Sequence, residues 1–321
     1  MQKSFSALEY ESKRKQTRRD KFLGELERTV PWKELAEVIV PYYPKGEGAG
    51  RPPVGLMPML KALIVQNSFG LSDEGMEDAI YDSHAIRMFV GIDLSRDSVP
   101  DSTTILGFRH LLERHNLTRA IFDKIGEHLS KKGLVLREGT IVDATLIAAP
   151  SSTKNRDKSR DPEMHQSKKG KQWYFGMKAH IGVDMESGLA HTVVATAGNV
   201  SDVAQAHTLL HGEEKHVMGD AGYIGIEKRE ENLDKTEVEW HIAAKRSKVE
   251  KISDENVRVA FEKLERAKAS IRSKVEHPFH VVKNLFKYRK VRYKGLAKNE
   301  AQLFILFGLA NLVLARRQLP V

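Results

Sequence analysis

Residues 140–147 of the chain read TIVDATLI, and at this point the apolar pattern of the sequence changes from helical spacing to strand-like runs. Apolar and β-branched residues in an unbroken run predict a buried strand. Asp143 interrupts the run, although aspartate is depleted in strands and a buried carboxylate is costly unless a cation or a donor meets it. The stretch therefore predicts a sheet and, within it, a candidate functional carboxylate.

The chain before this strand has a helical pattern. Up to about residue 135 the apolar residues recur at helical spacing, and strand-like alternation is scarce. Two helices are expected to begin after Ser72 and Asp101, because both residue types cap helix N-termini. We expect an all-helical N-terminal domain over residues 1–135. One further helical face is formed by Leu56, Met59, Leu60, Leu63 and Ile64, and ends at Gly70.

The chain after this strand is expected to complete a mixed α/β sheet, since strands alternate with helices there. Further strands are expected at residues 174–184, 189–197, 216–218 and 238–243. The first two of these form a hairpin, and the polar, basic residues 151–172 before them are expected to be a mobile loop. The chain beyond residue 244 is expected to be helical.

The composition excludes several classes of protein. With 40% hydrophobic and 30% charged residues, the 321-residue chain is not fully disordered. It contains no cysteine, which excludes disulfides, thiolate nucleophiles and cysteine-ligated metals. Charges throughout the first thirty positions leave no room for a signal peptide, and the longest apolar run, residues 303–315, is too short for a membrane span. A cytoplasmic protein is expected, and its net charge of +9 suits a polyanionic partner.

Two more carboxylates join Asp143 as candidates for catalysis. Asp220 directly follows the strand 216–218 and its Gly219, and Glu276 lies late in an expected helix. Carboxylate oxygens suit Mg²⁺ or Mn²⁺, and three such groups can hold two ions for in-line phosphoryl displacement. Each residue also has an ordinary interpretation: a salt bridge for Asp143, a turn cap for Asp220 and a solvated helix face for Glu276.

The order of these acids resembles that in the DDE transposases of bacterial insertion sequences. That family carries a Tyr-x₂-Arg-x₃-Glu-x₆-Lys signature, which Arg272, Glu276 and Lys283 match while Ala269 occupies the tyrosine position. Similarity to the subgroup with a helical N-terminal domain extends to Gly176-x-Lys178-x-His180-x-Gly182-x-Asp184, His277-Pro278-Phe279, Gly50-Arg51-Pro52-Pro53, and Pro100–Thr104 with Arg109.

The resemblance implies a ribonuclease H-like catalytic domain over residues 136–321. In the family's pattern Asp143 bridges two Mg²⁺ ions, with Mn²⁺ as a substitute, and Asp220 and Glu276 hold one ion each. The implied reaction cuts double-stranded DNA at terminal inverted repeats and joins the 3′-hydroxyl to target DNA. The resemblance further implies a homo-oligomer on DNA, with residues 1–135 binding DNA ends or other subunits, in the bacterial cytoplasm and nucleoid.

The resemblance also names candidate DNA contacts, each with an alternative. On an ideal helix Arg272, Glu276 and Lys283 share one face to within about 40° and 20°, although Pro278 is expected to kink or restart that helix between Glu276 and Lys283. Trp240 suits base stacking or core packing. The complete set of predicted DNA contacts is Arg272, Lys283, Lys178, Arg51, Arg109 and Trp240, with buried structural pairing as the alternative for Arg51 and Arg109.

Other features of the sequence have weaker interpretations. Asp202 is the carboxylate that would replace a member of the trio if the trio were misassigned. Histidines 207 and 211 have helical spacing, but no motif places a third zinc ligand beside them. Residues 245–298 hold 17 basic and six acidic residues, so their net charge of +11 exceeds that of the whole chain. This concentration around Glu276 suits a site that holds DNA phosphates.

Two functions remain as alternatives to an active transposase. One is a transposase-derived DNA-binding or regulatory protein, and the other is a nuclease on the same core that cuts DNA without joining it.

Overall fold

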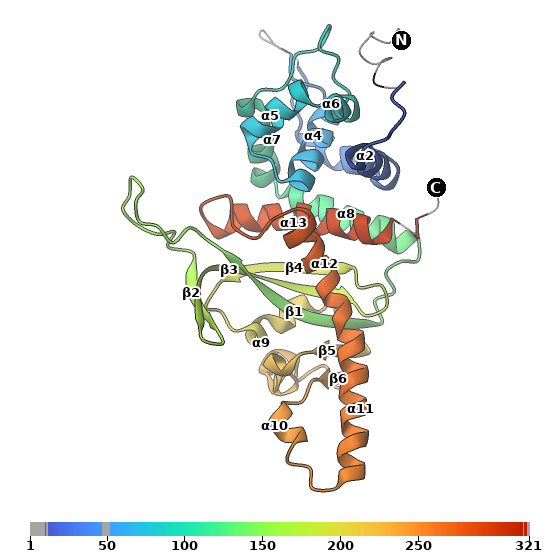
Figure 1. The fold of residues 1–321 in the computed structure, drawn as a ribbon, viewed down its shortest axis with the longest axis vertical. Coiled ribbons are helices and arrows are strands. Elements are labelled where there is room, and N and C mark those ends of the chain that lie inside the picture. Colours follow the sequence, from blue (N-terminus) through green and yellow to red (C-terminus); the bar gives the residue numbers. More distant parts are fainter. Residues whose placement is uncertain (1–9, 11, 47–51, 317, 320–321) are drawn as a thin grey trace.

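The computed structural model describes residues 10, 12–46, 52–316 and 318–319 (Figure 1). The first helices are α2 (Arg18–Thr29), α3 (Trp32–Ile39), η1 (Val40–Tyr42), α4 (Leu56–Phe69), α5 (Asp73–Asp82), α6 (His84–Val90), α7 (Ser102–Arg114) and α8 (Leu117–Lys131). The strands are β1 (Gly139–Ala148), β2 (His165–Lys169), β3 (Gln172–Asp184), β4 (Ala190–Ala197), β5 (His216–Gly219) and β6 (Glu239–Ile242). Between and after them lie α9 (Asp202–Gln205), η2 (Ala206–Leu209), η3 (Ala221–Tyr223), η4 (Ile226–Lys228), η5 (Glu230–Asn232), α10 (Arg246–Val249), α11 (Glu255–Arg272), η6 (Ser273–Val275), α12 (Glu276–His280), the π-helical turn η7 (Val281–Leu285) and α13 (Leu296–Ala315).

Local sequence sets the ends of the N-terminal helices. The Ser72 hydroxyl accepts the N–H of Gly75 at the start of α5, and the Asp101 carboxylate accepts the N–H of Thr104 at the start of α7. Both contacts satisfy backbone donors that have no partner inside the helix. At the end of α4, Gly70 has a φ of +70°, a left-handed conformation that glycine adopts without steric cost. The expected helical front is therefore present.

The sheet is mixed and has β1 near its centre. The strand order is β2-β3-β1-β5-β6, and β4 pairs with β3 outside this path. β1 runs antiparallel to β3 and parallel to β5, and β6 extends the parallel part as an edge strand. The predicted fold class, a helical front followed by a mixed α/β sheet, is confirmed.

The region predicted as a mobile loop is partly a strand. Residues 165–169 form β2, which pairs antiparallel with β3 from His165 opposite Gly176 to Lys169 opposite Gln172. The expectation of a loop was wrong there because charged lysines conceal the strand: four of its five residues are exposed, so it lacks the apolar alternation that marks a half-buried strand. Residues 149–164 lie outside the strands.

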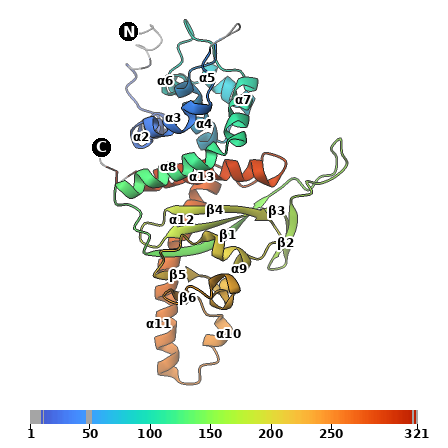
Figure 2. The same cartoon turned by 180° about the vertical axis from the view of Figure 1, so that it is seen from behind.

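Helix α13 connects the helical front to the sheet. It lies beside α8, with the N-terminal helices on one side and the sheet on the other (Figures 1 and 2). Most of its residues are buried, and one continuous hydrophobic core runs from Leu23 of α2 through α13 to Ile181 of β3. The apolar run 303–315 belongs to this helix, as expected. Within the described part of the chain, no helix is long and apolar enough to cross a membrane.

A second, smaller apolar cluster lies on the opposite face of the sheet. Val142 of β1 packs there with Tyr223, Ile226, Ala206 and Leu209. Its neighbours Ile141 and Ile147 belong to the main core instead. Alternate residues of β1 therefore face different layers, and Asp143 shares the face of Ile141.

Candidate active site

Asp143 is a largely buried carboxylate in the middle of β1. Its side chain is 17% exposed, and its Oδ1 accepts the N–H of Ala144 at 2.7 Å. Burial raises the pKa of Asp143 from 3.8 to about 7, and the negative charges of Asp220 and Glu276 act in the same direction. A carboxylate held in this way has its ionised form disfavoured until a cation approaches.

Asp220 lies beside Asp143 because two parallel strands are in register. Ile141 of β1 pairs with Met218 of β5, so two residues further along the two strands Asp143 stands level with Asp220. Asp220 follows the last residue of β5 and caps η3, where its Oδ1 accepts the N–H of Gly222 at 2.8 Å. The capping contact occupies one oxygen and fixes the orientation of the carboxylate.

Arg272 links the third acid to this pair. At the end of α11 its Nη1 lies 3.6 Å from Asp143 Oδ2 and 4.0 Å from Glu276 Oε1. Glu276, the first residue of α12, is 60% exposed. Arg272 therefore lies between Asp143 and Glu276, and the oxygens of the three acids do not all lie within 4.8 Å of one another. The site is an open cluster and not a closed single-ion cage.

Lys283 contacts the same strand as Asp143. Its ammonium donates to Thr145 Oγ1 and to the carbonyl oxygen of Leu146, both at 2.7 Å. Burial, followed by the charges of Lys169 and Arg289, lowers the pKa of Lys283. The group is thus a half-buried cation two to three residues along β1 from Asp143.

The helix that carries these residues changes its winding. After α11 the chain passes through the 3₁₀ turn η6, the α-helical turn α12 and the π-helical turn η7 without a break. The winding changes from 3₁₀ to α at Glu276 and from α to π at Val281, so one of the changes falls between Glu276 and Lys283, where a kink or restart was expected. Pro278 lies in the first turn of α12, between these two changes. The angle between Glu276 and Lys283 calculated for an ideal α-helix therefore does not apply, because the chain between them is not a regular α-helix. π-Turns of this kind are frequent at functional sites.

The donor set suits a hard divalent cation. Asp143, Asp220 and Glu276 offer only carboxylate oxygens, which are the ligands that Mg²⁺ and Mn²⁺ prefer. The carboxylate of Asp143 fits such a cation, because it is only 17% exposed and burial raises its pKa, so that a bound cation would stabilise its ionised form. Arg272 is the only basic side chain recorded within ion-pair distance of the trio among the described residues.

Lys178 and Asp202 are paired with each other. Lys178 Nζ donates to Asp202 Oδ1 and to the carbonyl oxygen of Val200, both at 2.8 Å. The buried ring of His180 lies behind them, with Nδ1 3.8 Å from Asp202 Oδ1. Asp202 therefore has a cationic partner within the chain. The role of Lys178 in DNA binding stays a prediction.

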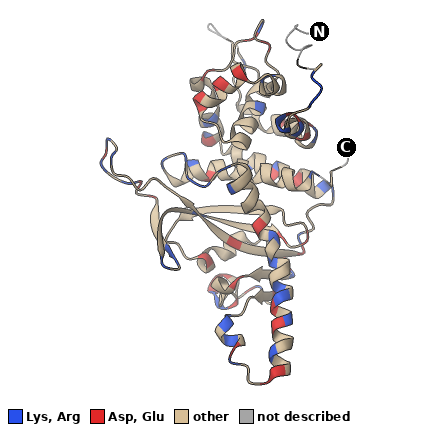
Figure 3. Cartoon of the chain, in the orientation of Figure 1, with Lys and Arg blue, Asp and Glu red and all other residues tan. Residues whose placement is uncertain are grey.

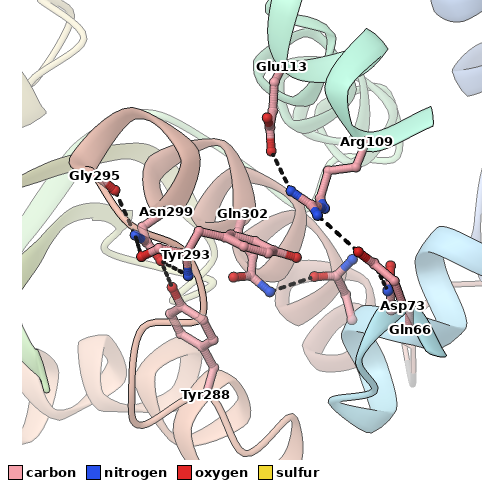
Figure 4. Close-up of polar contacts among 10 residues, drawn as sticks. Gln66, Asp73, Arg109, Glu113, Tyr288, Tyr293, Gly295, Asn299 and Gln302 are labelled. Carbon is pink, nitrogen blue, oxygen red and sulfur yellow. Dashed lines mark hydrogen bonds and ion pairs between the residues drawn. The ribbon is translucent and has the colours of Figure 1, made fainter. Parts of the chain in front are cut away.

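Arg109 joins two parts of the chain in the interior (Figure 4). Its guanidinium, 12% exposed, pairs with Asp73 at 3.0 Å and with Glu113 at 3.2 Å, and stacks 4.1 Å from the centre of the Tyr293 ring. These contacts favour the structural alternative for Arg109. Arg51, the other arginine predicted to contact DNA, lies outside the described residues.

Trp240 lines a cleft beside β6. Its ring is half-buried and packs against the smaller apolar cluster. The cleft has a volume of about 660 Å³ and lies between β6, α10 and α11. Four lysines contribute to its wall: Lys245, Lys248, Lys251 and Lys268. Both alternatives for Trp240 therefore have support, since it packs on one side and faces a basic cleft on the other.

The basic region predicted around Glu276 forms an extended surface. Lys and Arg recur along α10 and α11, which project away from the helical front (Figure 3). No residue of α11 is buried, and four of its five basic side chains also pair with acidic side chains of the chain: Arg258, Arg266, Lys268 and Arg272. The net charge of residues 245–298 predicts this surface from the sequence. The sequence does not predict the contacts of Arg272 with Asp143 and of Lys283 with β1, because both are tertiary contacts.

Comparisons with known proteins identify the family. A model described as "Transposase DDE domain" matches residues 136–312, more than half of the chain, and one described as "Transposase domain (DUF772)" matches residues 11–111. Among solved structures the chain is similar to "Crystal structure of the Mos1 Strand Transfer Complex", with 14% identity over 75% of this chain and 82% of that chain. The TM-score of 0.20 is too low for that likeness to bear on the fold. The chain belongs to the DDE transposases, DNA-cutting and strand-transferring enzymes with a ribonuclease H-like core.

Proposed function

We propose that Asp143, Asp220 and Glu276 are the catalytic residues of this transposase. The observation that carries the proposal is the state of Asp143: a carboxylate buried in a strand, level with Asp220, linked through Arg272 to Glu276, and resistant to ionisation. Such an arrangement destabilises the empty protein and becomes favourable when cations bind. Sites of this kind are typical of catalysis.

Members of the family act with divalent metal ions. We propose Mg²⁺ as the ion and two ions as the number, held by the trio with Asp143 between them. Bound ions of this type neutralise developing charge on phosphate oxygens and lower the pKa of water, which is the chemistry that phosphodiester hydrolysis needs.

The protein's own cations would position the DNA backbone. Arg272 is the nearest basic side chain to the acids, and its planar guanidinium suits a bidentate contact with phosphate. Lys283 is held in place by two hydrogen bonds to β1, so little side-chain entropy would be lost when a phosphate reaches it. We propose that both contact phosphates next to the scissile bond.

The transposase binds DNA, and we propose that its substrates are the terminal inverted repeats of its element and a target duplex in the bacterial cytoplasm. The basic faces of α10 and α11 support backbone contacts outside the active site. We further propose that residues 1–135 form a separate DNA-end-binding or multimerisation domain, and that the protein acts as a homo-oligomer.

Separate assays of nicking and joining test the proposal. The protein is incubated with Mg²⁺ and DNA carrying the sequences that flank its coding region, with 3′-end label, and each product is quantified. Asp143→Asn, Asp220→Asn and Glu276→Gln should each abolish both products. Asp234→Asn, an exposed acid away from the trio, is the matched control and should keep them.

Three outcomes would contradict the proposal. An inactive wild type indicates a DNA-binding derivative, and nicking without joining indicates a nuclease. Full activity of Asp143→Asn would exclude the trio as the catalytic site.

A further inference from the structure

Three potential metal ligands converge at the edge of the sheet, apart from the acid trio. His216 is the first residue of β5, and Glu239 and His241 are the first and third residues of β6. Because His216 pairs with Glu239 and Met218 with His241, the three side chains share one face of the two strands. Within the described part of the chain, this is the one group of three histidine, aspartate or glutamate ligand atoms that all lie within 4.8 Å of one another.

The ligand atoms form a nearly equilateral triangle. His216 Nδ1 lies 3.3 Å from Glu239 Oε2, His241 Nε2 lies 3.5 Å from the same oxygen, and the two nitrogens are 3.4 Å apart. Zinc binds nitrogen and oxygen at about 2.0–2.2 Å, so the edges of a zinc tetrahedron are about 3.3–3.6 Å long. The three distances match one face of that tetrahedron.

We propose that His216, Glu239 and His241 bind a Zn²⁺ ion. Two imidazoles and one carboxylate form a borderline donor set that suits Zn²⁺ and discriminates against Mg²⁺, which takes oxygen ligands. The side chains of His216, Glu239 and His241 are 37%, 68% and 34% exposed, so an ion can enter and water can complete the fourth position. The nearest cation on α11, Lys268, is paired with Glu265 at 3.1 Å.

The ion would fasten an edge strand. β6 is four residues long and pairs only with β5 in the strand order, so its attachment to the sheet rests on few hydrogen bonds. One ligand comes from β5 and two come from β6, so bound Zn²⁺ would link the strand that leads to Asp220 with the strand that carries Trp240. His216 begins β5 and Asp220 follows its last residue, which makes this site separate from the proposed catalytic site.

Titration with Zn²⁺ tests the proposal directly. The full chain is titrated calorimetrically in excess Mg²⁺, which occupies the acid trio, and the titration is repeated with Asp143→Asn. We expect one Zn²⁺ per chain with unchanged affinity in both proteins. Substitution of Co²⁺ should give the visible absorption bands of a tetrahedral ion.

Ligand variants then assign the site. His216→Ala and His241→Ala should each weaken Zn²⁺ binding at least tenfold, as should Glu239→Gln, whose exposed side chain has no part in the core. His110→Ala, an exposed histidine on α7, is the matched control and should bind as wild type does. Circular dichroism confirms that each variant is folded. Absence of saturable binding to wild type, or wild-type affinity in His241→Ala or Glu239→Gln, would overturn the proposal.

Discussion

At the scale of single residues, the pKa of Asp143 predicts how stability depends on pH. In metal-free protein the native state keeps this proton up to about pH 7, whereas the ordinary value is 3.8. The native state therefore binds more protons between these values, so the free energy of unfolding falls as pH rises from about 4 to 7. Asp143→Asn removes the ionisation and should be more stable than wild type at pH 8 by roughly 2–4 kcal/mol.

Urea denaturation in EDTA at pH 4 and pH 8 measures this effect. The advantage of Asp143→Asn should be nearly absent at pH 4, and Mg²⁺ should reduce it at pH 8 by stabilising the ionised wild type. Asp234→Asn should follow the wild-type pH dependence. Equal stability of Asp143→Asn and wild type at pH 8 would contradict the burial argument.

A second residue-scale prediction concerns Lys283. Lys283→Met keeps the length of the side chain but removes a charged donor worth about 1.5–3 kcal/mol, so DNA cleavage should fall roughly 10- to 100-fold. Lys287→Met, at an exposed position four residues later, should leave cleavage within about twofold of wild type. Initial rates of nicking at saturating Mg²⁺ give both values, and equal rates for the two variants would remove Lys283 from the site.

At the scale of elements, α13 is attached to β4 by a buried asparagine. Asn311 Oδ1 accepts the N–H of Ala190 at 2.8 Å, and its Nδ2 donates to the Ala190 carbonyl oxygen at 2.6 Å. Asn311→Ala leaves both backbone groups buried and unpaired, and should lower the free energy of unfolding by roughly 2–4 kcal/mol. Lys298→Ala, exposed on the same helix, is the control. Urea denaturation measures the loss, and faster hydrogen exchange of the Ala190 amide should accompany it.

The elements also show how much the sequence predicts. Alternation and β-branching were sufficient for β1, β3 and β4, whose ends lie within two residues of the expected positions. The strand β2 and the π-turn η7 escaped prediction because tertiary pairing decides them: β2 depends on β3, and η7 on the docking of Lys283 against β1. For the candidate site, the family resemblance was sufficient to predict the three acids. The position of Arg272 between Asp143 and Glu276 could be seen only in the folded chain.

At the scale of the whole molecule, Arg109 predicts coupling between distant segments. Its partners Asp73 and Tyr293 are 220 residues apart in the sequence, and Arg292 Nη1 also donates to the Leu71 carbonyl oxygen at 2.8 Å. Arg109→Met leaves two carboxylates half-buried without a cation and should cost roughly 2–4 kcal/mol of stability. Arg114→Met, exposed on the same helix, should cost less than about 0.5 kcal/mol.

Thermal unfolding and DNA-binding measurements on the two variants separate the alternatives for Arg109. A structural role lowers stability, whereas a role confined to DNA contact lowers affinity for DNA and leaves stability unchanged.

The position of α13 between α8 and the sheet has a consequence for synthesis on the ribosome. Residues 296–315 emerge after both of the layers that they separate, so a nascent chain has already exposed the apolar faces of α8 and β4 before their common partner exists. The helical front and the sheet can each collapse early, but they cannot dock until this helix leaves the exit tunnel. The incomplete chain therefore contains Asp143, Asp220 and Glu276 before it contains the helix that packs against their sheet. During this interval chaperones can bind the exposed apolar faces.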